Sequence, residues 1–255
     1  MKQIIGRKPV LEALNSRDDI SQVYIQFGQQ GGIINAIRVA AKKRGVKVND
    51  IPLQKFKTFT EHQNPQGVIA FISEQRFFSL EQIISSSKKT EKPLLLALDS
   101  IQDTHNLGAI LRTAECSGVN GVILTKHNSA PINESVVKTS TGATEHLMIC
   151  QVNNLASTLT QLKNEGFWIA GSSLENSREY TEVDYNLPLV LVLGNEEKGI
   201  RRLTAEKCDF LVKIPMKGKI QSLNVSVAAG VLLFEINRKR NNRETIRNIS
   251  DDAGD

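Results

Sequence analysis

Cysteine is scarce in this 255-residue chain, and neither its cysteines nor its histidines form a metal-binding pattern. Cys116, Cys150 and Cys208 lie far apart in the sequence without a CxxC pair, which argues against a disulfide framework and a zinc knuckle. The four histidines show no HExxH spacing, so the signature of a zinc hydrolase is absent. We therefore expect no metal ion, and the reducing cytoplasm fits the composition best.

Long apolar runs and the common nucleotide and hydrolase motifs are also lacking. No stretch of about 18 apolar residues occurs, and no apolar signal core follows the first residues, so we expect neither membrane insertion nor secretion. GxSxG and GxGxxG are absent, which disfavours serine hydrolysis and a conventional dinucleotide site. A GxxxxG spacing joins Gly194 and Gly199, but Ile200 follows where a P-loop needs lysine, so ATP hydrolysis by that route is disfavoured.

Basic residues are in moderate excess, with 32 Lys and Arg against 27 Asp and Glu and a formal net charge of +5. This balance favours a partner with negative charge such as nucleic acid, although an ordinary basic protein is an equal alternative. Each candidate for a phosphate contact is, taken alone, more typical of a solvated surface charge. These candidates are Lys42, Lys43, Arg44, Lys217, Lys219, Arg201 and Arg202.

The chain divides into two α/β parts separated by a polar stretch. Residues 1–74 alternate short helices and strands and predict a small α/β domain. Residues 75–92 are rich in serine and lysine and predict a linker, within which FFSLEQII has the pattern of a helical turn. Residues 93–241 alternate apolar runs with helices, which predicts a mostly parallel sheet covered on both faces. Residues 242–255 are polar and mixed in charge and predict a flexible tail.

Ligands of parallel sheets bind beyond the carboxyl ends of the strands, and polar segments follow three of the predicted strands. In DTHNLGAILRTAECSG, Asp103 or Asn106 is suited to cap a helix. Arg112 then lies off the apolar face of that helix, where a simple exposed pair with Glu115 is the plainer interpretation. In LVLVLGNEEKG, Gly194 either admits a ligand close to the backbone or only makes a turn.

The third segment, IPMKGKIQSLNVSVAAG, passes from the end of a strand into a long helix that we expect from about Asn224 to Arg240. Ser222 or Asn224 can accept a backbone N–H at the start of that helix. From spacing alone, capping is the better supported role for both residues.

Taken together and in this order, the three segments resemble the three motifs of the SpoU family, also called the TrmH family, of RNA ribose 2′-O-methyltransferases in the SPOUT superfamily. The resemblance covers about residues 93 to 240. GRKPVLEAL and QGVIAF resemble the amino-terminal RNA-binding domain of the subgroup that modifies a guanosine of 23S ribosomal RNA, a small α/β domain similar to ribosomal protein L30e. The resemblance further implies a carboxyl-terminal SPOUT-type trefoil knot, which general topology rules would disfavour.

The resemblance also implies a methyl donor, S-adenosylmethionine, and a set of site residues. The residues implied to bind this cofactor are Leu193, Gly194, Ile214, Met216, Ser222 and Leu223. The residues implied in catalysis are Arg112, Asn106, Glu196 and Asn224. By resemblance Arg112 removes or polarises the proton of the ribose hydroxyl, but arginine is normally always protonated. A base with a lowered pKa and a cationic clamp therefore both stay open.

Two positions depart from the family pattern, and only the second, in the amino-terminal domain, bears on the RNA target. Thr104 stands where the family often has proline, and Pro65 stands where the amino-terminal domain often has histidine. The resemblance implies ribosomal RNA as the substrate, while the same reaction on tRNA and a non-catalytic role in RNA binding or ribosome assembly are the alternatives. It also implies a homodimer through the knotted domain, part of whose contact the apolar face of the last helix could supply, although the pattern alone favours intramolecular core for that face. The face comprises Val225, Ala228, Ala229, Leu232, Leu233 and Ile236.

Overall fold

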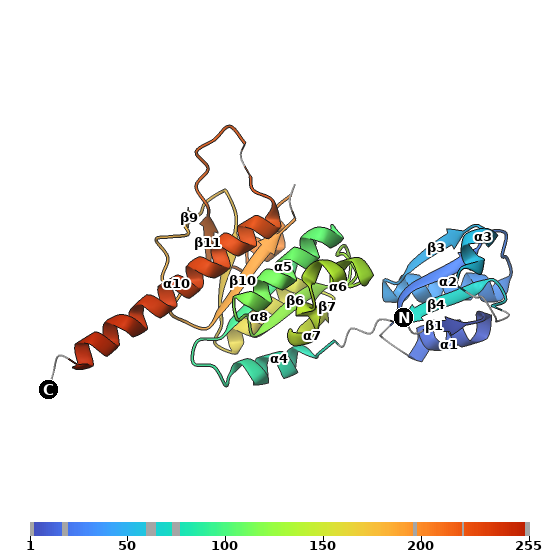
Figure 1. The fold of residues 1–255 in the computed structure, drawn as a ribbon, viewed down its shortest axis with the longest axis horizontal. Coiled ribbons are helices and arrows are strands. Elements are labelled where there is room, and N and C mark those ends of the chain that lie inside the picture. The colour runs from blue at the N-terminus through green and yellow to red at the C-terminus, as the bar shows by residue number, and fades with distance from the viewer. Residues whose placement is uncertain are drawn as a thin grey trace. The chain divides into compact units, whose positions relative to one another are not determined.

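The computed structural model describes residues 3–16, 20–59, 65–72, 77–195, 198–220 and 222–252, with the backbone alone described beyond Asn241. The chain divides into two compact units (Figure 1). The first unit comprises Met1–Arg76, to which the short segment Pro131–Asn133 is also assigned, and the second comprises Phe77–Ala130 and Glu134–Asp255. Each unit has its own sheet.

The first unit is a four-stranded sheet in the order β1-β4-β2-β3 with helices beside it. β4 pairs antiparallel with β1 and β2, and β2 pairs parallel with β3. Buried apolar side chains of the first two helices, including Leu14 and Ile37, pack on one sheet face. The elements are β1 (Gln3–Ile5), α1 (Arg7–Ser16), β2 (Ile20–Gln26), α2 (Gly32–Arg44), β3 (Lys47–Ile51), α3 (Leu53–Lys57) and β4 (Val68–Ile72). The predicted small α/β unit is therefore present.

The second unit contains a seven-stranded sheet in the order β7-β6-β5-β10-β8-β11-β9, and all of its pairs are parallel. The central strands are fully buried, as expected of parallel strands covered on both faces. The strands are β5 (Leu94–Asp99), β6 (Gly121–Thr125), β7 (Ile149–Val152), β8 (Trp168–Ser172), β9 (Arg178–Glu179), β10 (Leu189–Gly194) and β11 (Phe210–Lys213). The predicted mostly parallel sheet is confirmed.

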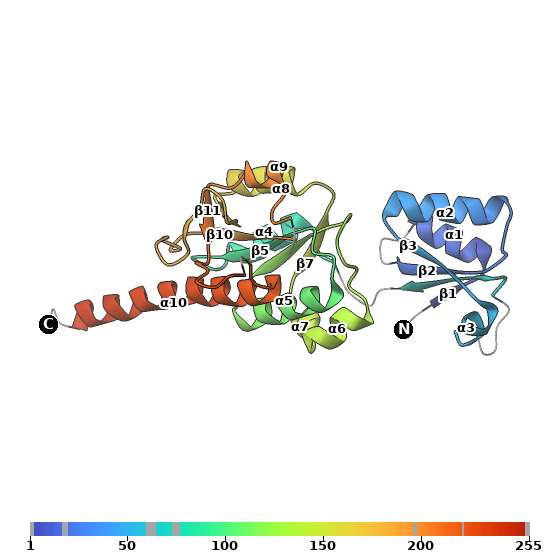
Figure 2. The ribbon, with the colours of Figure 1, turned by 90° about the horizontal axis from the view of Figure 1, so that it is seen from above.

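Helices cover both faces of this sheet (Figure 2). Side chains of α4 and α8 share one core with Leu95, Ile123 and Val190, whereas α5 and α10 pack against each other on the opposite side. The helices are α4 (Leu80–Ser87), α5 (Thr104–Cys116), α6 (Glu134–Ser140), α7 (Ala143–His146), α8 (Leu155–Asn164), α9 (Arg202–Ala205) and α10 (Val225–Asp252).

Two boundaries differ from the sequence-based expectation. The stretch 75–92, predicted as a linker, contains α4, whose Ile83 and Ile84 are buried in the core of the second unit. α4 begins at a capping box formed by Ser79 and Gln82, and it extends the helical turn that FFSLEQII predicted. The last helix continues to Asp252 and does not end near Arg240. Because no proline or glycine occurs from residue 241 to 252, nothing in that stretch interrupts a helix.

The proposed dimer face of α10 is mostly intramolecular core. Val225, Ala229, Leu232, Leu233 and Ile236 are 6% exposed or less within this chain, and Ala228 is half-buried. The interpretation of this face as intramolecular core, which the pattern favoured, is therefore confirmed, because the face packs against the sheet and α5. Within the part of the chain that the structure describes, none of the helices has the length and apolar character needed to cross a membrane. The knot stays a prediction.

Candidate active site

A pocket of about 520 Å³ lies at the carboxyl ends of β8, β10 and β11, beside the start of α10. Parallel strands present their carboxyl ends at one edge of a sheet, which is where ligands of such sheets bind. We call this cavity the edge pocket. It is lined by Ser172, Ser173, Leu174, Glu175, Leu193, Gly194, Asn195, Lys198, Gly199, Ile200, Lys213, Ile214, Met216, Ser222, Leu223, Val225 and Ala228.

The structure brings the six predicted cofactor residues together. Leu193 and Gly194 end β10 on one wall of the edge pocket, and the other four come from the segment between β11 and α10. Leu193 is almost fully buried, whereas Leu223 is 37% exposed. The apolar part of the lining suits a flat, weakly polar group, and the serines and backbone amides at the strand ends provide hydrogen-bonding groups.

The turn after β10 explains why glycine occurs at position 194. A Cβ atom on Gly194 would lie 2.1 Å from the carbonyl carbon of Gly199 and 2.2 Å from the amide nitrogen of Ile200. Asn195 and Gly199 exchange two backbone hydrogen bonds of 3.0 and 2.8 Å, and Gly199 has a φ of +63°. Glycine at position 194 is therefore explained by the tight turn, in which a side chain would collide with Gly199 and Ile200. The same turn forms one wall of the edge pocket.

Asn224 caps α10 and also reaches α5. Its side-chain Oδ1 accepts hydrogen bonds from the Ser226 amide at 2.8 Å and the Ser226 hydroxyl at 2.6 Å. Its Nδ2 donates to Oδ1 of Asn106, 2.9 Å away and 118 residues distant in sequence. Asn106 is not the cap of α5, because its own backbone amide donates to Asp103 at 2.7 Å. Two predicted catalytic residues are thus in direct contact.

The other two predicted catalytic residues are placed differently. Arg112 is exposed on α5, away from its buried face, and makes no side-chain hydrogen bond or ion pair with another described residue. The suggested pair with Glu115 is therefore not formed in this structure, and the guanidinium is accessible from solvent. Glu196 lies outside the described residues.

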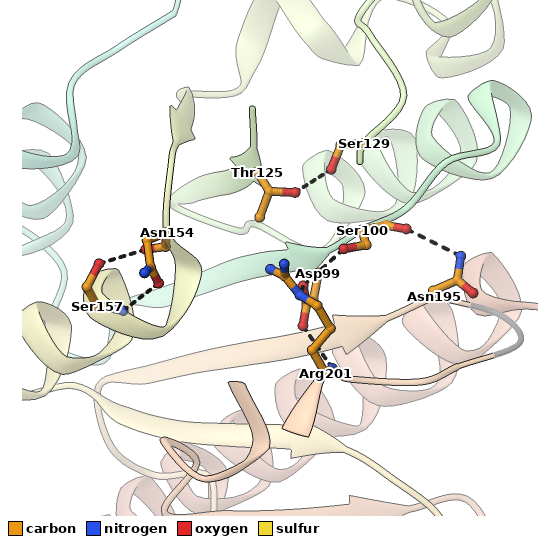
Figure 3. A network of polar contacts seen from close by, with 8 residues as sticks. All are labelled: Asp99, Ser100, Thr125, Ser129, Asn154, Ser157, Asn195 and Arg201. Atoms are coloured by element: carbon orange, nitrogen blue, oxygen red, sulfur yellow. Dashed lines mark hydrogen bonds and ion pairs between the residues drawn. The ribbon is translucent and has the colours of Figure 1, made fainter. Parts of the chain in front are cut away.

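A buried carboxylate that the sequence reasoning missed lies beside the edge pocket. Asp99 ends β5 with a fully buried side chain, and its two oxygens accept from Arg201, at 2.6 Å from Nε and 3.0 Å from the backbone amide (Figure 3). Ser100 donates to the same carboxylate at 3.3 Å, and its carbonyl accepts from Asn195 at 3.3 Å. The sequence did contain a signal for Asp99, because it is an acidic residue directly after an apolar run. Polar residues in that position marked the other three segments as candidates for the site.

The two partly or fully buried thiols near the sheet are poor candidates for chemistry. Burial raises the pKa of Cys150 and of Cys208 to about 12, so both stay protonated at neutral pH, and a thiol is a weak nucleophile in that form. Among the side chains that the structure describes, no three His, Cys, Asp or Glu residues are grouped to hold a metal ion. Among the described residues, the charged groups that line the edge pocket are Glu175, Lys198 and Lys213.

Comparison with known families gives two matches that together span most of the chain. Residues 93–234 match the model described as the SpoU rRNA Methylase family. Residues 3–78 match the model described as RNA 2′-O ribose methyltransferase substrate binding. The first match contains the edge pocket, Asn106, Arg112 and Asn224, and the second coincides with the four-stranded unit.

Individual relatives agree with these matches. A Staphylococcus saprophyticus protein that carries the name of the TrmH family of tRNA/rRNA methyltransferases is 41% identical over 239 residues, 93% of this chain and 96% of its own. The crystal structure of an AdoMet-bound rRNA methyltransferase from Sinorhizobium meliloti is similar, with a TM-score of 0.60, 27% identity, and coverage of 92% of this chain and 86% of that chain. The crystal structure of the A. aeolicus TrmH/SpoU tRNA modifying enzyme is also similar, with a TM-score of 0.56, 34% identity, and coverage of 65% of this chain and 84% of that chain.

Proposed function

This chain belongs to the SpoU rRNA methylase family of RNA methyltransferases, and from that membership we propose that it methylates a ribose 2′-hydroxyl of RNA, a guanosine of 23S ribosomal RNA. S-adenosylmethionine is the methyl donor of the family, as the AdoMet-bound relative illustrates. The single observation that carries the proposal is the convergence of the three motif segments. They place a pocket of cofactor size next to the contact between Asn106 and Asn224.

The residues of the edge pocket fit S-adenosylmethionine. A volume of about 520 Å³ falls within the range of about 300–1,000 Å³ that is typical of pockets for ligands of this size. Leu193, Ile214 and Leu223 offer apolar surface for an adenine ring, and Ser222 adds a hydroxyl. We propose that these residues, with Gly194 and Met216, hold the cofactor. When bound, it supplies an electrophilic methyl group that an oxygen nucleophile takes in one displacement, for which alignment is the main requirement.

The polar residues beside the pocket then act on the RNA. Asn224 is fixed by its cap bonds to Ser226 and can orient Asn106 through its amide, so the two link α5 to α10. Arg112 is accessible to a large substrate, and since arginine normally stays protonated, we propose that it stabilises the developing alkoxide as a cation. The hydroxyl proton passes to solvent water, the new O–CH3 bond replaces the S–CH3 bond, and S-adenosylhomocysteine leaves. Glu196, by resemblance, completes the set.

Ribosomal RNA is favoured over tRNA by the two-unit layout. The rRNA methyltransferase from S. meliloti is matched over 92% of this chain, whereas the A. aeolicus tRNA modifying enzyme is matched over only 65%. The four-stranded unit, which matches the substrate-binding family, is the natural candidate for the additional RNA contacts. A non-catalytic RNA-binding or assembly factor is the second candidate, but such a protein would not need Arg112 and the Asn106–Asn224 contact.

The deciding experiment compares 2′-O-methyl sites in ribosomal RNA from cells with and without this protein. We expect one guanosine of 23S RNA to lose its methyl group in the deletion and to regain it when the gene is restored. Purified protein incubated with labelled S-adenosylmethionine should methylate RNA from the deletion strain and not RNA from the parent. Methylation of tRNA alone would move the substrate to tRNA, and cofactor binding without transfer to any RNA would favour the assembly factor.

We also propose that the chain acts in the cytoplasm as a homodimer. Its three cysteines are free, which is compatible with a reducing compartment. Val227 and Phe234 on α10 are 51% and 53% exposed and lie seven positions apart, so they share one face of the helix, and that face differs from the buried one. A monomeric mass at micromolar concentration would contradict the dimer.

A further inference from the structure

The turn after β10 is attached to the end of β5 at both of its ends. At its start, the side-chain amide of Asn195 donates to the Ser100 carbonyl at 3.3 Å. At its end, Arg201 donates from its backbone amide and its Nε to the two oxygens of Asp99, at 3.0 and 2.6 Å. Figure 3 shows the two attachments on either side of the Asp99–Ser100 pair.

The described residues between these two attachments form one wall of the edge pocket. Asn195, Lys198, Gly199 and Ile200 all line it, and the Asn195 side chain also accepts a hydrogen bond from the Lys198 amide at 3.3 Å. Neither Asp99 nor Arg201 is among the lining residues. Asp99, which fixes the position of Arg201, can therefore affect a ligand in the edge pocket only through the residues of this wall.

The chemistry of the pair suits a fixed support. The Asp99 side chain is fully buried, and a buried carboxylate is strongly unfavourable unless it is paired and hydrogen-bonded. Arg201 satisfies both oxygens with two donors, one of which is backbone, so the main chain at this point is held and not only the side chain. Ser100 adds a third donor and has a φ of +66°, a conformation that residues other than glycine rarely adopt. Strain of this kind persists only where the surroundings hold it in place.

A phosphate contact is the competing role for Arg201, whose side chain is 49% exposed. The charge of its guanidinium is, however, already balanced by Asp99 at 2.6 Å. A cation that is neutralised in this way attracts a phosphate less than a lone one.

We propose that Asp99 is a positioning residue for the methyl donor: through Arg201 and Ser100 it sets the pocket wall formed by Asn195, Lys198, Gly199 and Ile200. The inference rests on the proposed function for the identity of the ligand. It assigns a role in cofactor affinity to two residues that touch neither cofactor nor RNA.

The test uses the full chain and S-adenosylhomocysteine as the probe, titrated by calorimetry. Arg201→Met and Asp99→Asn should each raise its dissociation constant by about tenfold or more, because small displacements of a site commonly cost one to two orders of magnitude. In turnover assays the same variants should raise KM for the donor while kcat at saturating donor changes little. The double variant should bind no more weakly than the worse single variant, because both substitutions remove the same support.

Arg238→Met is the matched control. Arg238 also pairs with a carboxylate, Glu235, and has similar exposure at 56%, but it lies on α10 away from the turn after β10. It should leave the affinity for S-adenosylhomocysteine unchanged.

Two results would overturn the proposal. One is Arg201→Met with wild-type affinity for the probe and a lower melting temperature, which would make the pair a structural support only. The other is loss of RNA affinity with unchanged probe affinity, which would make Arg201 a phosphate contact. A wild-type protein that binds the probe but does not methylate ribosomal RNA would overturn the proposed substrate, and the probe affinities of the variants would still decide the role of Asp99.

Discussion

The edge pocket and α5 are linked by the hydrogen bond between Asn224 and Asn106, but the chain holds the pocket wall and the exposed surface of α5 in different ways. The turn that forms the pocket wall is fixed by backbone hydrogen bonds and by the buried Asp99. On α5, Arg112 is exposed and has no side-chain partner among the described residues. A small ligand of constant shape rewards a rigid, backbone-lined pocket, whereas a large RNA needs reacting groups that it can reach from solvent. Under the proposed function, this difference separates affinity for the methyl donor from the chemistry on the RNA.

Removal of the exposed Arg112 side chain should have the largest effect, and it should lower the rate of methyl transfer to RNA without weakening binding of the methyl donor. We expect Arg112→Ala to lower kcat by about 100-fold or more, since a single charge-stabilising donor commonly contributes two to three orders of magnitude. Affinity for S-adenosylhomocysteine should stay at the wild-type value, and RNA binding should change little. Single-turnover methyl transfer and filter binding of RNA measure the two effects.

Arg112→Lys keeps the positive charge and is the matched variant. It should retain part of the activity if the cation stabilises the alkoxide. Equal losses of transfer and RNA affinity in Arg112→Ala would instead make Arg112 an RNA contact.

A methyl group on Gly194 should weaken binding of the methyl donor. Gly194→Ala places a Cβ atom within 2.1–2.3 Å of the backbone of Gly199 and Ile200, so the turn must move. We expect at least a tenfold loss of donor affinity, roughly the effect of misplacing a binding group. The melting temperature should also fall, because backbone atoms cannot yield as the end of a flexible side chain can.

Gly218→Ala is the control for this substitution. An added Cβ at Gly218 meets no atom within 4 Å. Gly218 lies in the segment between β11 and α10, which also contributes Met216 to the edge pocket. It should leave donor affinity and melting temperature near wild type. A Gly194→Ala variant with normal donor affinity would show that the turn does not shape the binding site.

The difference between pocket and α5 also explains what could be predicted from the sequence. Apolar runs followed by polar segments predicted the strands and the sheet edge where the candidate site lies, because a buried strand can be recognised from a short stretch of apolar residues. Contacts across the site were not predictable in this way. Asp99 and Arg201 are 102 residues apart, and Asn106 and Asn224 are 118 apart, so only the sheet order brings each pair together. Short elements such as β9 and α9 were missed because two to four residues carry no period.

Asn224 lies where the two parts meet, and one atom of its side chain serves each. Oδ1 caps α10 through Ser226, and Nδ2 donates to Asn106 on α5. Asn224→Asp keeps the accepting oxygen and removes the donor, so the helix cap should survive while the contact with Asn106 is lost. We expect methyl transfer to fall by about tenfold, less than the roughly 100-fold or more of a group that itself moves a proton, because Asn224 acts through Asn106. Asn224→Ala removes both functions and should in addition lower the free energy of unfolding by about 1 kcal/mol.

The pair of variants separates capping from catalysis, because Asp and Asn are equally good caps. Thermal unfolding and single-turnover transfer should be measured on both proteins. If Asn224→Asp transferred methyl groups at the wild-type rate while Asn224→Ala lost both stability and activity, Asn224 would act only as a cap. A slow but fully stable Asn224→Asp would instead place the Asn106–Asn224 contact on the acceptor side of the site.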